Sequence, residues 1–325
     1  MTNDWGLLIR SLLICLTLFP SLGYAQVDVR NPVTSHDWAD PTVWQAGDGY
    51  YYSMATGGGR LIRSSDLREW QRTDISPFDE QTWSRLHQIG NHLWAPDVTM
   101  VDGSRIAYVT MYRSAEDASI VALKEVTPGH FEYAATLTQG KVTGILDTID
   151  PEAVTDGKTG RVWLFFGSIG GIHRVELTKD GLAIKPDAKY EHVAGVTMHE
   201  DGSRMRVFEG SYLYRRKGYW YLFVSAGWYN NASYHLCVGR SRKLTGTFRD
   251  REGHDMRLGY ATTILSSQEG DRFFGPGHCG EIITLPDGKD YITYHCHDKE
   301  MDGGNPRPMM LQQISWDNDG WPFFE

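Results

Sequence analysis

Residues 40–54 read DPTVWQAGDGYYYSM, and this stretch contains the unit that decides the fold. A polar residue, Asp40, comes first, and a short apolar segment, a turn with two glycines and an aromatic-rich segment follow it. Short segments rich in β-branched and aromatic residues on either side of a glycine turn predict two antiparallel β-strands. The stretch therefore predicts a hairpin with a chemically active side chain at its start.

Four further copies of this unit follow along the chain. The copies begin 57, 53, 59 and 69 residues apart and occupy residues 97–111, 150–167, 209–225 and 278–295. These intervals exceed the periods of helical solenoids and suit sheets of four strands. Because such a sheet cannot bury both of its faces alone, we expect five sheets to close around a channel. The predicted fold is an all-β, five-bladed β-propeller in a single domain.

Local signals agree with this prediction. Asp-Gly pairs at 102–103 and 287–288 are typical of tight hairpin turns. Helical periodicity is rare, and residues 79–87 are the stretch where we expect a helical turn or two.

The first 25 residues predict a secretory signal peptide. An apolar run covers residues 7–19, and small residues stand at Gly23 and Ala25. The run is shorter than the ~20 apolar residues that a membrane span requires. We expect cleavage after Ala25, a propeller domain over residues 26–325, and a secreted or periplasmic protein with no membrane segment after cleavage. An uncleaved anchor helix is the alternative.

The composition excludes several classes of protein. The chain has 41 acidic and 32 basic residues, and this net charge of −9 argues against a nucleic-acid partner. Its 11 Trp, 17 Tyr and 12 Phe exclude a disordered chain, and its 35 glycines do not follow a collagen repeat. We expect a globular monomer.

Three cysteines follow the predicted signal, at Cys237, Cys279 and Cys296. An odd number cannot pair completely. A hairpin that turns over residues 286–289 places Cys279 directly opposite Cys296, where a cross-strand disulfide is geometrically feasible. Two reduced core cysteines are the alternative, because a one-residue shift in register separates the pair.

Equivalent positions of the five copies are expected to meet at one end of the channel. The innermost strand of each blade lines the channel of a propeller, so the residues that begin the copies arrive at the same mouth. These residues are Asp40, Asp97, Asp150, Glu209 and His278. A single Asp more often caps a turn. Four carboxyls and an imidazole at one mouth, however, separate each other's pKa values, which is a usual sign of chemistry.

Paired carboxyls in a polar, aromatic-rich cleft fit the cleavage of a glycosidic bond. One carboxyl protonates the leaving oxygen, and the other activates water or attacks the sugar carbon. Asp40 and Glu209 begin copies one and four, which are not neighbours in a ring of five, so we expect them across the channel from each other. That favours the separation of roughly 6.5–9.5 Å that accommodates a water molecule and inverts the anomeric centre. Asp150 is the adjacent group that can orient the acid and raise its pKa.

A set of short motifs runs in order along nearly the whole chain after residue 25. The motifs are Ala39-Asp40-Pro41, Trp94-Ala95-Pro96-Asp97, Ile149-Asp150-Pro151, Phe166-Gly167-Ser168, Glu209-Gly210-Ser211-Tyr212, Val238-Gly239-Arg240-Ser241, Gly275-Pro276-Gly277-His278 and Asp319-Gly320-Trp321-Pro322. Together they resemble glycoside hydrolase family 43, and especially its arabinanase branch. The resemblance implies a five-bladed propeller that cleaves arabinose- or xylose-containing plant cell-wall polysaccharides with inversion.

The resemblance also implies roles for single residues. Asp40 matches the general base of the family, Asp150 the residue that modulates the pKa of the acid, and Glu209 the general acid. His278 matches a histidine near a channel metal ion, usually calcium, that is held largely through water. Asp37 competes with Asp40 for the role of base, and Pro41, which follows Asp40, favours Asp40.

Four residues are candidates for binding the substrate: Trp94, Asp97, Ser168 and Arg307. Trp94 is a candidate sugar platform, with core packing as the alternative. Asp97 is expected to line the site without transferring a proton. Arg307 resembles an arginine that some family members place near the substrate, and a solvated loop position is its alternative. His295 and His297 alternate along one strand without a third ligand at zinc spacing, so we interpret them as structural.

Three functions stay open at the level of sequence. The first expectation is an endo-acting 1,5-α-L-arabinanase, and the second is an exo-acting α-L-arabinofuranosidase or β-xylosidase. The third is a non-catalytic glycan-binding propeller, since a fold alone does not prove activity. Ser211 and Cys279 stand where the arabinanase pattern often has Pro and Asn, which leaves the exact glycan open.

Overall fold

The computed structural model describes residues 29–195 and 207–324. The predicted signal peptide and its cleavage position after Ala25 lie outside the described residues.

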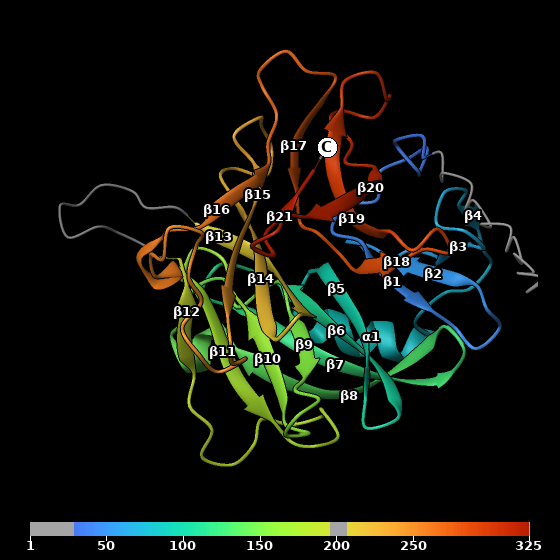
Figure 1. Ribbon diagram of the computed structural model, residues 1–325. Coiled ribbons are helices and arrows are strands. Elements are labelled where there is room, and N and C mark those ends of the chain that lie inside the picture. Colours follow the sequence, from blue (N-terminus) through green and yellow to red (C-terminus); the bar gives the residue numbers. More distant parts are fainter. Residues whose placement is uncertain (1–28, 196–206, 325) are drawn as a thin grey trace, which may run out of the picture.

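Five antiparallel sheets follow one another around a common centre, which confirms the predicted five-bladed β-propeller (Figure 1). Blade one contains β1 (Thr42–Gln45), β2 (Tyr51–Met54), β3 (Ile62–Ser64) and β4 (Gln71–Arg72). Blade two contains β5 (His92–Val101), β6 (Ser104–Tyr112), β7 (Ala118–Thr127) and β8 (His130–Gln139). Blade three contains β9 (Glu152–Thr155), β10 (Val162–Phe166), β11 (Ile172–Leu177) and β12 (Glu191–Ala194).

The last two blades complete the ring. Blade four contains β13 (Phe208–Arg216), β14 (Tyr219–Ala226), β15 (His235–Ser241) and β16 (Thr262–Leu265). Blade five contains β17 (Phe273–Gly277), β18 (Ile282–Thr284), β19 (Asp290–Asp298), β20 (Met309–Trp316) and β21 (Pro322–Phe323), with both β17 and β18 paired to β19.

Local sequence explains the turns and the main helix. Asp102 and Gly103 both have positive φ, at 45° and 78°, and join β5 to β6 as the predicted two-residue hairpin. Helix α1 (Glu80–Ile89) covers the predicted helical stretch, and the side chain of Asp79 caps it by accepting the backbone N–H of Thr82. Helix α2 (Gly140–Thr143) and the 3₁₀ turn η1 (Met256–Leu258) are single turns that the sequence pattern does not predict.

Hydrophobic residues fill the junctions between blades. Within the described residues, five buried clusters are found, one at each junction of neighbouring blades. Trp163 of blade three and Trp220 of blade four share one cluster, and Val43 of blade one and Tyr291 of blade five share another. Full burial of such a side chain contributes about 1.5–3 kcal/mol. The junctions therefore stabilise the ring and hold its inner strands in place.

The ends of the propeller meet through the segment before β1. The backbone N–H of Val33 donates to the carbonyl of Met309 at 2.9 Å, and that of Trp38 donates to the carbonyl of Arg307 at 3.0 Å. Asn31 exchanges side-chain hydrogen bonds with the backbone of Leu311. The residues just before β1 thus lie along the start of β20, which closes blade one against blade five.

A ring of hydrogen bonds, here named the channel belt, links the innermost strands of all five blades. In each case a side chain of one blade accepts a backbone N–H of the next, at 2.6 to 3.4 Å. The accepting residues are Thr42, Asp97, Glu152, Tyr212 and Glu281. Burial raises the pKa of Asp97 to about 7 and that of Glu281 to about 8.

The register of the last blade corrects the proposed disulfide. Thr284 pairs with Asp290, which shifts β18 by one residue from the predicted hairpin, and Cys279 lies between β17 and β18. The shift arises because the turn is closed one residue earlier, by the N–H of Leu285 donating to the carbonyl of Lys289. Among the described residues, Cys279 and Cys296 are buried and form no disulfide, so the alternative of two reduced core cysteines is the correct one.

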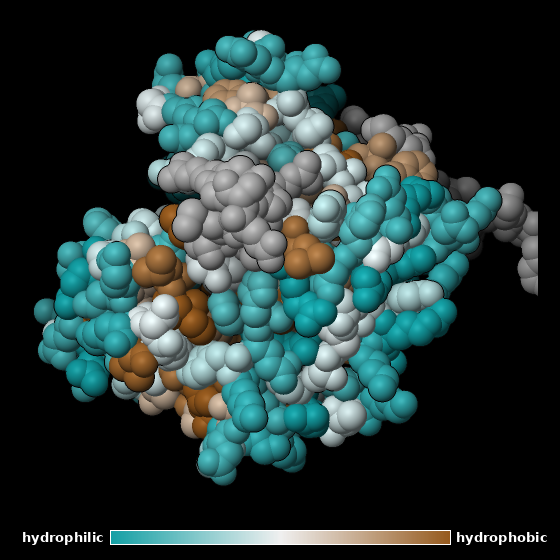
Figure 2. Space-filling model, turned by 90° about the vertical axis from the view of Figure 1, so that its left-hand side faces the viewer, coloured by the Kyte–Doolittle hydropathy of each residue, from teal (hydrophilic) through white to brown (hydrophobic). Residues whose placement is uncertain are grey.

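The surface of blades three and four is mostly hydrophilic, with hydrophobic residues in small, separate groups (Figure 2). Within residues 29–195 and 207–324, no helix combines the length and the apolar character that a membrane crossing needs.

Candidate active site

In each blade, one residue near the start of the innermost strand has a backbone conformation in the left-handed region. The five residues are Asp40, Ala95, Asp150, Gly210 and His278, with φ between 34° and 59°. Four of them are not glycine, and non-glycine residues rarely adopt positive φ. The recurrence of positive φ at this position in five blades therefore indicates that the blades share the same turn. Asp40, Asp150 and His278 are therefore equivalent by backbone geometry as well as by sequence.

Two of the predicted leading residues are displaced from this turn. Glu209 lies one residue before Gly210, and Asp97 lies two residues after Ala95, because both strands contain a β-bulge near their start. Glu209 still reaches the channel mouth. Asp97 does not line the cavity there, and its Oδ2 accepts the N–H of Ala153 in the channel belt. The expectation that Asp97 contacts substrate is therefore not retained.

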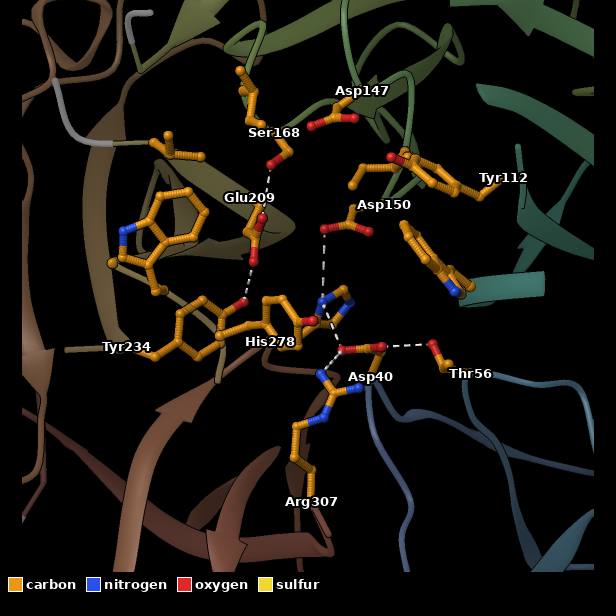
Figure 3. Close-up of a pocket in the computed structure, with 17 residues that line it drawn as sticks. Asp40, Thr56, Tyr112, Asp147, Asp150, Ser168, Glu209, Tyr234, His278 and Arg307 are labelled. Carbon is orange, nitrogen blue, oxygen red and sulfur yellow. Dashed lines mark hydrogen bonds and ion pairs between the residues drawn. The ribbon is translucent and has the colours of Figure 1, made fainter. Parts of the chain in front are cut away.

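A cavity of about 320 Å³ opens at the channel mouth, and all seven of the other predicted site residues line it (Figure 3). These residues are Asp40, Trp94, Asp150, Ser168, Glu209, His278 and Arg307. Asp37, the competing base, is exposed and accepts the backbone N–H of Arg307 at 2.6 Å instead of lining the cavity. Aromatic rings of Trp94 and Tyr112 stack at 3.8 Å on one wall.

Asp40 is held in its ionised form. Burial alone would raise its pKa, but the positive charge of Arg307, with Nη1 at 3.6 Å from Oδ1, leads the opposing influences and the pKa falls well below the usual range. Thr56 donates its hydroxyl to Oδ2 at 2.5 Å, and the ring of His278 lies 3.3 Å from Oδ1. Asp40 is therefore a carboxylate that can accept a proton.

Glu209 has the opposite tendency. Burial raises the pKa of its carboxyl, and the carboxylates of Asp40 and Asp147 add to this effect. Two hydroxyls oppose it by donating to the carboxyl, that of Ser168 to Oε2 at 2.7 Å and that of Tyr234 to Oε1 at 2.8 Å. Two carboxyls of one cavity thus differ in proton affinity, which is the arrangement that a base and an acid require.

Asp150 belongs to the same charge system. Burial, followed by the negative charges of Glu209 and Asp40, raises its pKa well above the usual range. The N–H of Gly210, the residue after Glu209, donates to Oδ2 of Asp150 at 3.0 Å. Asp150 is thereby tied to the backbone that carries Glu209.

Two aromatic rings support these carboxyls: that of Tyr234, which sequence reasoning missed, and that of His295, which it interpreted as structural. The rings of Tyr234, His295 and His278 stack in succession, with centroids 6.0 and 6.1 Å apart. Burial lowers the pKa of His295 to about 3, so its ring is neutral, and its Nδ1 accepts the backbone N–H of Asp40. A Cβ at Gly277 would overlap the ring of Tyr234, so the glycine leaves the space that this ring fills.

A second missed residue is Asp147, which lies three positions before Asp150 and lines the cavity. Its carboxyl is buried, and Oδ1 has no hydrogen-bond partner among the residues that the structure describes. Burial raises its pKa. Its spacing from Asp150 was the available signal, although a single Asp in a loop more often caps a turn.

Among the described residues, His278 does not lie with two further His, Cys, Asp or Glu ligand atoms close enough to share an ion directly. In the described part of the chain, one group of three His, Cys or carboxylate ligand atoms is close enough to share an ion, and it consists of Asp250, Glu252 and His254. Those residues lie between β15 and η1, and no Asp or Glu of the cavity belongs to the group. Calcium prefers six to eight oxygen ligands. We therefore derive no catalytic step through a metal ion.

Comparison with known proteins agrees with this geometry. The chain is 28% identical over 329 residues to the "Extracellular exo-alpha-(1->5)-L-arabinofuranosidase ArbA" of Cellvibrio japonicus (strain Ueda107), covering 95% of this chain and 89% of that protein. It is 27% identical over 299 residues to the "Extracellular endo-alpha-(1->5)-L-arabinanase 1" of Bacillus subtilis (strain 168), covering 88% and 87%.

Solved structures and the family comparison point the same way. A Cellvibrio cellulosa alpha-L-arabinanase complexed with arabinohexaose superimposes with a TM-score of 0.77 at 26% identity, covering 90% of this chain and 96% of that one. Residues 29–322 match Glycosyl hydrolases family 43, which includes every blade of the propeller. The chain therefore belongs to glycosyl hydrolase family 43.

Proposed function

We propose that this protein is an inverting glycoside hydrolase that cleaves α-1,5-linked L-arabinofuranosyl units of arabinan, with Asp40 as general base and Glu209 as general acid. The observation that carries the roles is the opposite perturbation of two carboxyls in one cavity. The pKa of Asp40 is lowered and that of Glu209 is raised. The substrate is inferred from the relatives, whose names refer to α-1,5-arabinan.

The reaction follows from these protonation states. Glu209 transfers its proton to the glycosidic oxygen as the bond from that oxygen to the anomeric carbon breaks. Asp40 accepts a proton from a water molecule, whose oxygen bonds to the anomeric carbon on the opposite face. Asp150 accepts the N–H of Gly210 and so holds the backbone next to Glu209. The sugar product has the inverted configuration, and each carboxyl returns to its starting state by exchange with solvent.

Other cavity residues have supporting roles in this proposal. The stacked rings of Trp94 and Tyr112 offer an apolar wall for a sugar. Arg307 keeps Asp40 ionised, and Ser168 fixes one oxygen of Glu209. His278 is neutral because burial lowers its pKa, and a calcium ion held near it through water stays a prediction.

We propose endo action, with exo action as the alternative because one relative is named an exo-acting arabinofuranosidase. We also propose secretion, supported by the signal sequence and by the two extracellular relatives, and a monomeric state.

Product analysis tests the function. Residues 26–325 are incubated with linear arabinan, branched arabinan and xylan, and released sugars are separated by chromatography. Short oligosaccharides from linear arabinan are expected, with no release from xylan. Arabinose alone would replace the endo proposal with an exo enzyme. Binding of arabinan without any sugar release would support a non-catalytic propeller and overturn the proposal.

A further inference from the structure

Five basic residues gather at one edge of blade four, and we name them the basic edge. They are Arg215, Lys217, Arg240, Arg242 and Lys243. The first two lie at the end of β13 and in the turn after it, and the other three lie at the end of β15 and just beyond it. Trp220 of β14 pairs with Arg215 on one side and with Ser241 on the other, so about 10 Å separates the two groups. Arg216 is not included, because its side chain faces Asp290 at 3.9 Å.

The basic edge lies at the end of the blade that is opposite to the catalytic cavity. Glu209 lines the cavity and pairs with Ser225, whereas Arg216 pairs with Tyr219 at the other end of the same two strands. Seven residues separate Glu209 from Arg216 along β13, which corresponds to about 20 Å for a strand with a bulge. A molecule bound at the basic edge therefore leaves the catalytic cavity open.

The charges of the basic edge are not neutralised by neighbouring acidic side chains. Four of the five residues are exposed, and Arg240 is partly exposed. Within residues 29–195 and 207–324, no carboxylate oxygen lies within 4.0 Å of a side-chain nitrogen of the five. The carboxylates of Asp317 and Asp319, in the turn between β20 and β21, face Arg251 instead, at 2.7 and 3.8 Å. The edge is thus a local positive surface on a chain whose net charge is −9.

One aromatic ring orients two of the guanidinium groups. Arg240 and Arg242 lie 4.3 and 4.4 Å from the ring centroid of Tyr219. Arg240 also lies 4.2 Å from the ring centroid of Trp321, and its Nη1 donates to the backbone carbonyl of Asp319 at 2.7 Å. An arginine that stacks on a ring keeps its planar fork of N–H donors, which can bind a carboxylate through two parallel hydrogen bonds. Because Tyr219 orients these groups in advance, less side-chain freedom is lost when a carboxylate binds.

The spacing and the chemistry of these groups favour a polymer of sugar carboxylates over a nucleic acid. Oriented arginines select planar carboxylates, and cations spread over two strand ends suit a ligand whose charges recur along a chain. Duplex DNA carries one charge per ~1.7 Å, and a protein with a net charge of −9 repels so dense a polyanion beyond the basic edge. A polyuronate carries one carboxylate per sugar, so its charge density is lower.

We propose that the basic edge binds an anionic polysaccharide made of uronic acid units. Binding there holds the protein on acidic polysaccharide while the catalytic cavity at the other end of the blade stays accessible. A second attachment of this kind raises the effective concentration of the cavity near other chains of the same material. The binding itself requires no bond cleavage, so this inference goes beyond the proposed function.

The test measures the dissociation constant of the purified protein for polygalacturonate by isothermal titration calorimetry at pH 7 and low ionic strength. Fully methyl-esterified polygalacturonate is the matched neutral ligand, and duplex DNA is the competing polyanion. A triple variant replaces three exposed cations of the basic edge: Arg215→Gln, Arg242→Gln and Lys243→Gln. The matched control removes two arginines and one lysine from exposed positions on β4, α1 and β7: Arg72→Gln, Arg85→Gln and Lys124→Gln.

We expect the triple variant to bind polygalacturonate about tenfold more weakly, because one exposed charge contact contributes roughly 1.4- to 5-fold. The control should stay within about twofold of the unaltered chain. The esterified polymer should bind at least about tenfold more weakly than polygalacturonate, and added salt should weaken the binding of the charged polymer. The comparison of the two polymers uses the unaltered chain, so it does not depend on the folding of a variant.

Four results would overturn the inference. They are no binding of polygalacturonate, equal binding by the triple variant, equal binding of the esterified polymer, and tighter binding of duplex DNA than of polygalacturonate. Failure of the proposed hydrolysis is a separate result, because it appears as uncleaved arabinan and leaves these binding measurements unchanged.

Discussion

Replacement of Glu209 by Gln tests the proposed acid, because the side chain keeps its size and loses its transferable proton. General acid catalysis contributes typically 10²–10⁴-fold, so we expect kcat/KM on linear arabinan to fall by about that factor. The leaving group of a 4-nitrophenyl arabinoside needs little protonation. We therefore expect a loss of about tenfold or less on that substrate.

The same substitution has a calculable effect on stability. The carboxyl of Glu209 accepts one hydrogen bond from Ser168 and one from Tyr234. An amide has a single oxygen acceptor, so one hydroxyl loses its partner at a cost of about 1 kcal/mol. For a chain of this size that corresponds to a Tm lower by about 1–2 °C.

The assay compares kcat/KM on both substrates and records the melting curve of each protein. A large loss on arabinan, a small loss on the nitrophenyl glycoside and a modest fall in Tm together support the assignment. Near-normal hydrolysis of arabinan by the variant, or equal losses on both substrates, would refute Glu209 as the proton donor.

Three further substitutions give independent checks. Arg307→Gln removes the positive charge that keeps Asp40 ionised, so the pKa of Asp40 should rise. We expect kcat/KM to fall about tenfold more at pH 4 than at pH 7. An unchanged acid limb of the pH profile of kcat/KM would contradict this. The buried carboxyl of Asp97 has a pKa raised to about 7, so its ionisation lowers the stability of the unaltered chain as pH rises from about 4 to about 7. Asp97→Asn removes this carboxyl. The variant should match the unaltered chain in Tm at pH 4 and exceed it by about 5 °C at pH 8, and a disadvantage that grows with pH would count against the argument. Gly277→Ala displaces the ring of Tyr234 and should lower kcat/KM about fivefold, which steady-state kinetics on arabinan measures.

The fold was predictable because the repeat carries it. The unit at residues 40–54 occurs five times in all, and each copy supplies a strand, a turn and a second strand to one blade. Positions within a blade were less predictable, because β-bulges add residues that a linear alignment does not reveal. One bulge moves Asp97 from the cavity into the channel belt, and a turn closed one residue early separates Cys279 from the position opposite Cys296.

The site was only partly predictable for a related reason. Asp40, Asp150 and His278 begin their copies, so the repeat itself aligns them. Tyr234 and His295 come from other strands or loops and reach the site through the packing of blades four and five. No spacing in the sequence connects Tyr234 to Glu209, and the alternation of His295 with His297 indicated a shared face without indicating which one points to Asp40.

The configuration of the newly formed sugar gives the most direct test of opposed acid and base. The reaction on linear arabinan is followed by proton NMR from the first seconds, before mutarotation mixes the anomers. An attacking water activated by Asp40 on the face opposite Glu209 yields the β-anomer first from an α-linked chain. Initial appearance of the α-anomer would mean that configuration is retained, and it would contradict the proposed pairing of Asp40 and Glu209.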